Sequence, residues 1–96
     1  MENKKTVEFH QKAYVCIHVF ENVRPVLLVS RMDGDWCFLC GQDHPEDASY
    51  YRVVGIGHVL SHYPDLNEVM NLRPNEEAER SHVGEPWIWT NLDSVQ

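Results

Sequence analysis

The two apolar runs joined by Asp33-Gly34 constrain the fold of this chain more than any other feature. One run is VLLVSRM, at Val26–Met32, and the other is DWCFLC, which ends at Cys40. Glycine readily adopts the positive φ of a type I′ turn, so Asp-Gly between two apolar runs is a strong signal for a β-hairpin. The sequence therefore predicts antiparallel strands at Val26–Met32 and Trp36–Cys40.

The segments outside this hairpin change from the periodicity of a strand to that of a helix. Tyr14–Phe20 (YVCIHVF) places alternate residues on two faces and predicts a strand, and residues 50–54 (YYRVV) predict a short one. From Ile56 onward, apolar residues recur at i, i+3, i+4 and i+7, which predicts a helix that includes His58–Tyr63. Leu60 belongs to the apolar stripe of this helix and is expected to be buried.

The remainder of the chain combines short helical, irregular and strand-like segments. Pro64 ends the first helix, and a second helix is predicted over Leu66–Met70. The acidic segment 73–86 is expected to be mostly irregular, although Ala78–Ser81 could pair at a sheet edge. Trp87–Trp89 is expected to form a last strand. Strands followed by helices and one more strand indicate an α+β fold. We expect a small, mainly antiparallel sheet with one or two short helices packed on one face.

Size and charge restrict the functions open to this chain. At 96 residues it is expected to form a single α+β domain, residues 1–96, with residues 1–12 flexible at its start. Its 15 acidic and 8 basic residues give a net charge of −7, which disfavours nucleic acid and favours a basic protein partner. The N-terminus lacks the pattern of a signal peptide, and no apolar run is long enough to span a bilayer. We therefore expect a cytoplasmic protein with no membrane association.

Two pairs of residues raise the alternative of a zinc site. Cys37 and Cys40 form a Cys-x2-Cys pair, and His58 and His62 form a His-x3-His pair further along. Zinc fingers place such a cysteine pair on a hairpin and such a histidine pair on a helix. However, an odd separation in a strand puts the two cysteines on opposite faces, and both histidines lie about 130° from the apolar stripe. We predict no metal at these residues, and keep a zinc-binding or thiol redox module based on Cys37 and Cys40 as the alternative.

The other patterns predict no catalytic site. Cys16 and His18 share a strand face and could pair, but we interpret them as part of a half-buried strand. Gly55-Ile56-Gly57 lacks the third glycine of a dinucleotide-binding loop. No Ser-His-Asp or two-carboxylate arrangement can be argued from the spacing, and three cysteines do not suggest a disulfide framework. We therefore expect a protein that is not an enzyme and needs no cofactor.

Protein binding is predicted at two places. The first is the acidic loop after the hairpin, whose polar residues are Asp43, His44, Glu46 and Asp47. The second is the C-terminal strand, where Trp87 and Trp89 alternate with Ile88 and therefore lie on one face. Tryptophan anchors rimmed by charge are common in protein interfaces. The alternative is that both tryptophans close the open end of the core.

Two segments, Trp36–Gly41 and Val53–Trp87, resemble small bacterial domains of unknown function that are grouped with toxin-immunity proteins. The motifs that carry the resemblance are a Pro-Asp-Leu step, a Leu-x-Pro turn, an Ala-x-Arg segment and a Gly-x-x-Trp segment, at Pro64–Leu66, Leu72–Pro74, Ala78–Arg80 and Gly84–Trp87. The resemblance implies an α+β fold, an intracellular role and a binding function. It carries no catalytic residues. Neutralisation of a basic toxin is the specific function that we expect from it.

Overall fold

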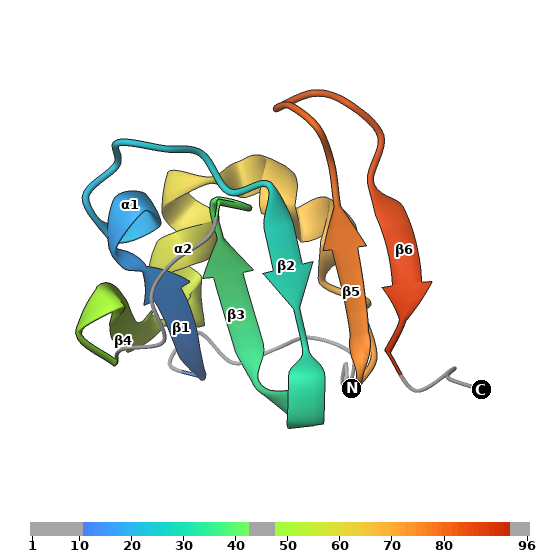
Figure 1. Ribbon diagram of the computed structural model, residues 1–96, viewed down its shortest axis with the longest axis horizontal. Coiled ribbons are helices and arrows are strands. Elements are labelled where there is room, and N and C mark those ends of the chain that lie inside the picture. The colour runs from blue at the N-terminus through green and yellow to red at the C-terminus, as the bar shows by residue number, and fades with distance from the viewer. Residues whose placement is uncertain (1–10, 43–47, 93–96) are drawn as a thin grey trace, which may run out of the picture.

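The computed structural model describes residues 11–42 and 48–92, and these form a mixed sheet of six strands in the order β4-β1-β3-β2-β5-β6 (Figure 1). The strands are β1 (Lys12–Cys16), β2 (Leu28–Ser30), β3 (Trp36–Leu39), β4 (Tyr51–Gly55), β5 (Glu76–Glu79) and β6 (Ile88–Asn91). Neighbouring strands are antiparallel except for β1 and β3, which are parallel. The predicted flexible start, residues 1–12, lies mostly outside the described residues.

Short helices accompany the sheet, and the expected α+β architecture is confirmed. They are the α-helices α1 (Ile17–Phe20) and α2 (Ile56–His62) and the 3-10 turns η1 (Met32–Gly34), η2 (Ala48–Tyr50) and η3 (Pro64–Val69). Figure 1 shows α2 and the turns that follow it on one face of the sheet, behind β1, β3 and β2. No helix in the described part of the chain is both long enough and apolar enough to cross a membrane.

The core lies between α2, η3 and the sheet face that they cover. The strand register places Val15 beside Phe38, Phe38 beside Val29, and Val29 beside Ala78, so these buried side chains form a row across four neighbouring strands. The helical side contributes further buried apolar residues, namely Ile56, Val59, Leu66 and Val69. Phe38 is at 0% exposure and lies on a strand with neighbours on both sides, so it is the central residue of this core.

The hairpin predicted at Asp33-Gly34 is confirmed, but its first strand is shorter than the predicted Val26–Met32, because β2 covers only Leu28–Ser30 and Met32 belongs to η1. β2 and β3 pair antiparallel, with Ser30 opposite Cys37. Asp33 and Gly34 have φ values of 57° and 86°, and both residues of a type I′ turn require a positive φ. The turn therefore has the conformation that its two residues favour.

The prediction of a strand over all of Tyr14–Phe20 is wrong beyond Cys16. Ile17 begins a single helical turn, α1, which is closed by a bond of 2.9 Å from the Glu21 N–H to the Ile17 carbonyl. The turn buries Val19 and leaves Phe20 exposed. A strand preference of β-branched residues is weak by itself, and here the burial of Val19 outweighs it.

The helical predictions are correct in position and need two corrections. α2 covers most of His58–Tyr63, but the predicted second helix, Leu66–Met70, is the 3-10 turn η3. Leu60 is half-buried rather than buried, because Ile56 and Val59 occupy the side of α2 that faces the sheet.

Candidate functional site

The outermost strand of the sheet, β6, is the most exposed element near the predicted tryptophan site. All its residues are exposed, including Ile88 at 69% and Trp89 at 44%. The register places Trp89 opposite Ala78, on the helix side of the sheet, and Ile88 opposite Glu79, on the other side. Because β6 is the last strand of the sheet, it presents apolar side chains on both faces of an edge strand.

The two tryptophans have different environments. Trp87 is half-buried against the core, its ring lies 4.2 Å from the guanidinium carbon of Arg80, and its indole N–H donates to Glu68 Oε1 at 3.2 Å. Trp89 has much of its surface exposed. Trp87 thus matches the interpretation of a residue that closes the core, whereas Trp89 is available to a partner. The predicted acidic loop with Asp43, His44, Glu46 and Asp47 lies outside the described residues.

Arg80 anchors the start of the connection from β5 to β6. Its side chain is buried, with Nη1 2.7 Å from Asp65 Oδ2, and Nη2 donates to the Val26 carbonyl at 2.9 Å. The same guanidinium supports the ring of Trp87. One side chain therefore links η3, the segment before β2 and the segment before β6, which fixes the position of the edge strand.

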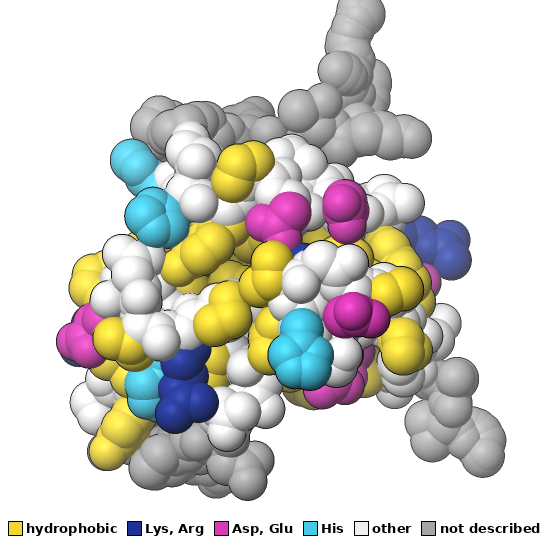
Figure 2. Space-filling model, turned by 90° about the horizontal axis from the view of Figure 1, so that it is seen from above, with side chains coloured by type: hydrophobic (Ala, Val, Ile, Leu, Met, Phe, Trp, Pro, Cys, Tyr) yellow, Lys and Arg dark blue, Asp and Glu magenta, His cyan; other side chains and the backbone are white. Residues whose placement is uncertain are grey.

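Acidic residues dominate residues 65–85, the stretch of chain that precedes β6 and includes its partner strand β5. They are Asp65, Glu68, Glu76, Glu77, Glu79 and Glu85. The two arginines of this stretch are both in ion pairs, Arg80 with Asp65 and Arg73 with Glu76 at 3.6 Å. Figure 2 shows acidic side chains next to apolar ones on the surface seen from above. The surroundings of the edge strand are therefore negative.

Glu77 is the acidic residue of this region that carries a cost for folding. Burial, followed by repulsion from Glu79, raises the pKa of Glu77 above its ordinary value of 4.5. Glu77 and Glu79 are two residues apart in β5, so both side chains lie on the same face of the sheet. The ionised form of Glu77 is therefore less favourable in the folded chain than in the unfolded one.

We expect Glu77→Gln to raise Tm at neutral pH. Because its pKa is raised in the folded chain, Glu77 lowers the free energy of unfolding as the pH rises from the ordinary pKa through the raised one. Glutamine has no carboxyl to ionise and removes this loss. The gain should vanish at about pH 3.5, where the carboxyl is protonated in both states. Thermal melts at both pH values measure it, with the exposed Glu85→Gln as the control. A lower Tm for Glu77→Gln at neutral pH would show that the carboxylate makes a stabilising contact instead.

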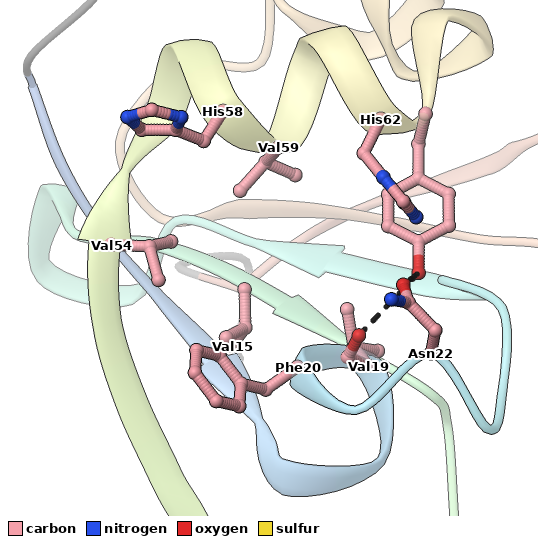
Figure 3. Close-up of a pocket in the computed structure, with 9 residues that line it drawn as sticks. Val15, Val19, Phe20, Asn22, Val54, His58, Val59 and His62 are labelled. Atoms are coloured by element: carbon pink, nitrogen blue, oxygen red, sulfur yellow. Dashed lines mark hydrogen bonds between the residues drawn. The ribbon is translucent and has the colours of Figure 1, made fainter.

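An apolar pocket of about 280 Å³ lies between α1, β4 and α2 (Figure 3). Val15, Val54 and Val59 line it, and Phe20 lies across from His58. The hydroxyl of Tyr63 donates to Asn22 Oδ1 at 2.9 Å at the other end of the pocket. Sites for small organic ligands usually begin at about 300 Å³ and include precisely oriented polar groups, so this pocket is at the small end of the range.

Two cysteines and a histidine lie close together where β1 and β3 end. Cys16 is the last residue of β1, His18 belongs to α1, and Cys40 directly follows β3. Their donor atoms all lie within 4.8 Å of one another, with Cys40 Sγ 3.7 Å from His18 Nδ1. Both cysteines are buried, at 0% and 1% exposure, and His18 is half-buried. The half-buried strand predicted to contain Cys16 and His18 ends at Cys16, and the two residues instead form a three-residue cluster with Cys40, which follows another strand.

The pKa values of the Cys37 and Cys40 thiols are raised, which is the opposite of the shift that an activated thiol needs. Burial, with a smaller contribution from Cys16, raises the pKa of Cys40, although the Gln42 backbone and Arg24 oppose the shift. Burial and the nearby Asp35 also raise the pKa of Cys37. Redox-active cysteines need a lowered pKa, because the thiolate is the reactive form. These environments give no support to a thiol redox module based on Cys37 and Cys40.

The residues of the zinc alternative do not assemble in the described part of the chain. Cys37 lies in the middle of β3, on the face opposite Phe38, whereas His58 and His62 are exposed on α2. Cys40 is the one member of the alternative that joins a cluster, and its companions are Cys16 and His18. Among the described residues this is also the one group of three or more histidine, cysteine and acidic side chains with the spacing of metal ligands.

Comparison of the whole sequence with models of protein families, with curated proteins and with solved structures finds no match.

Proposed function

We propose that this chain is a binding domain without catalytic activity, which uses β6 to capture an extended, basic segment of another protein. The exposed edge strand, with Ile88 and Trp89 on its two faces, is the observation that carries the proposal. Neutralisation of a basic toxin in the cytoplasm, which the resemblance to toxin-immunity proteins implies, would be an activity of this kind.

The physical basis is strand addition at an open sheet edge. An edge strand has backbone N–H and C=O groups that point away from the sheet, and an extended peptide can pair with them while its side chains enter flanking pockets. Natural edge strands are commonly protected by charged residues or proline. Ile88–Asn91 contains neither, so the outer edge of β6 lacks this protection.

Charge selects the kind of partner. The acidic residues around β6 outnumber the basic ones, which are already paired with Asp65 and Glu76. Glu79 of β5 is opposite Ile88 of β6 in the register. A lysine or arginine of the added peptide that pairs beside Ile88 would therefore lie near Glu79. A second copy of this chain would bring like charges together, because each copy has a net charge of −7. The occupant that fits is therefore a basic segment of a different protein.

We expect Trp89→Ala to weaken binding of a basic strand peptide at least about tenfold while lowering the free energy of unfolding by less than about 1 kcal/mol. Peptides selected from a displayed library with the wild-type chain serve as the probe. The selected peptides should contain lysine and arginine in alternation with β-branched residues. Their affinity should fall as salt is added. Amide chemical shifts should place the bound peptide at β6.

Trp87→Ala is the matched control, because Trp87 packs against the core and Arg80. It should lower the free energy of unfolding by about 3 kcal/mol, in contrast to Trp89→Ala. Selected peptides without a basic bias, or with unchanged affinity for Trp89→Ala, would refute the proposal. A concentration-dependent dimer that Trp89→Ala abolishes would also refute it, because the occupant would then be a second copy.

A further inference from the structure

We propose that Cys16, His18 and Cys40 form a binding site for a thiophilic metal ion such as Zn²⁺. The site lies at the ends of β1 and β3, whereas β6 is at the far side of β2 and β5, so this proposal is independent of the proposed protein-binding edge. Thiolate sulfur and imidazole nitrogen are the ligand types that zinc prefers in proteins.

The spacing of the donor atoms is close to that of a coordination shell. Zinc bonds of about 2.3 Å to sulfur and 2.0–2.1 Å to nitrogen, at tetrahedral angles, separate sulfur from nitrogen by about 3.6 Å and the two sulfurs by about 3.8 Å. Cys40 Sγ lies 3.7 Å from His18 Nδ1, and no pair of donor atoms in the cluster exceeds 4.8 Å. The widest pair therefore has to close by at most about 1.2 Å, the difference between 4.8 Å and the sulfur–nitrogen separation of about 3.6 Å, which side-chain rotation can supply.

Two neighbouring strands and one helical turn position these three side chains. β1 and β3 are parallel, so Cys16 and Cys40 lie at the same end of neighbouring strands. The helical turn α1 then places His18 beside them. The turn is held by the burial of Val19 and by backbone bonds from the Glu21 N–H to the Ile17 carbonyl at 2.9 Å and from the Asn22 N–H to the Val19 carbonyl at 3.1 Å. The ligand geometry therefore depends on backbone elements that belong to the core.

The chemistry of binding suits a buried location. Each thiol transfers its proton to solvent as its sulfur bonds to the metal, and the ring of His18 donates the lone pair of Nδ1. Two thiolates neutralise the charge of Zn²⁺, so the complex of the ion with its three ligands adds no net charge to the interior. The half-buried His18 gives the ion a route from solvent. Three protein ligands leave one position of a tetrahedral ion for a further ligand.

The substitutions that should abolish ion binding at this site differ from those that would abolish it at the Cys-x2-Cys pair of Cys37 and Cys40. Purified reduced chain, treated with a chelator and then dialysed against Zn²⁺, should retain about one ion per chain and gain Tm, because the ion binds the folded state. Co²⁺ in place of Zn²⁺ should give thiolate-to-cobalt charge-transfer absorption. His18→Gln and Cys40→Ala should lose the ion and both signals.

Cys37→Ser is the matched control, since it lies on the same strand as the site but on the face opposite Phe38. It should retain the ion, as should a variant with both His58→Gln and His62→Gln. No ion on the wild-type chain would overturn the proposal, and so would loss of the ion in Cys37→Ser or in the double histidine variant. His18 is only half-buried, so His18→Gln tests the site without removing a core side chain. A folded His18→Gln variant, judged by circular dichroism, that retains both the ion and the charge-transfer absorption would equally overturn it.

Discussion

Phe38→Ala is expected to lower the free energy of unfolding by about 3–5 kcal/mol, which is a large part of the stability of a small domain. Phe38 has no exposed surface and lies next to Val15 on one side and Val29 on the other. Its ring also stacks near that of Trp36, with centroids 6.1 Å apart. Loss of the ring leaves a cavity that rigid strands on both sides cannot fill. Chemical denaturation with urea measures the loss.

Leu39→Ala provides the control for this result. Leu39 is the next residue of β3, on the opposite face of the sheet, and it is half-buried. Its substitution should cost clearly less than that of Phe38, because less apolar surface is lost and solvent can fill the space. Equal losses for the two variants would show that both faces of the sheet are equally packed.

Arg80→Leu is expected to destabilise the chain by about 3 kcal/mol or more. The substitution removes the partner of Asp65, leaves the Val26 carbonyl without the donor at 2.9 Å, and takes away the support of the Trp87 ring. Breaking a buried ion pair from one side is costly because the remaining groups are left unpaired. Urea melts give the magnitude, and indole fluorescence should report the altered surroundings of Trp87.

Two companion variants separate the contributions of Arg80. Arg80→Lys keeps the charge but not the planar fork, so it should fall between the wild type and Arg80→Leu. Asp65→Asn should cost less than Arg80→Leu, because an asparagine side-chain oxygen can still accept from the guanidinium, which also keeps its bond to the Val26 carbonyl. If Arg80→Leu is as stable as the wild type, the guanidinium is not a link between η3 and the sheet.

Local signals in the sequence were sufficient where a turn or a helix depends on its own residues. Asp33 and Gly34 adopt the positive φ values that their types favour, and Ile56 and Val59 bury the predicted side of α2. The signal failed where tertiary packing decides. Residues Ile17–Phe20 have a strand pattern yet form a helical turn. Glu76–Glu79 lack strand propensity yet form β5, because that segment pairs with β2 on one side and β6 on the other.

The metal-ligand cluster was outside the reach of a motif search for a physical reason. Cys37 and Cys40 are close in sequence, but the strand sends them to different environments, while Cys16 and Cys40 meet only because β1 and β3 are parallel neighbours. The signal that could have found the cluster was the Cys16-x-His18 pair, combined with a pairing of these two strands. At the edge strand, the predicted strand Trp87–Trp89 begins one residue later, at Ile88, so the alternation holds for Ile88 and Trp89, whereas Trp87 precedes β6.

The strand order has a consequence for a chain that is still being synthesised. β1 leaves the ribosome first, but its neighbours in the sheet are β3 and β4, and β4 ends only at Gly55. At a translation rate of about 5–20 residues per second, the 39 residues from Cys16 to Gly55 take roughly 2–8 seconds to appear. Until β3 is complete at Leu39, the apolar side of the nascent β1, with Ala13 and Val15, has no native strand on either side, and the β4 side stays open until Gly55. A ribosome-bound chaperone that recognises short apolar segments would therefore find a binding site in β1 before its partner strands emerge.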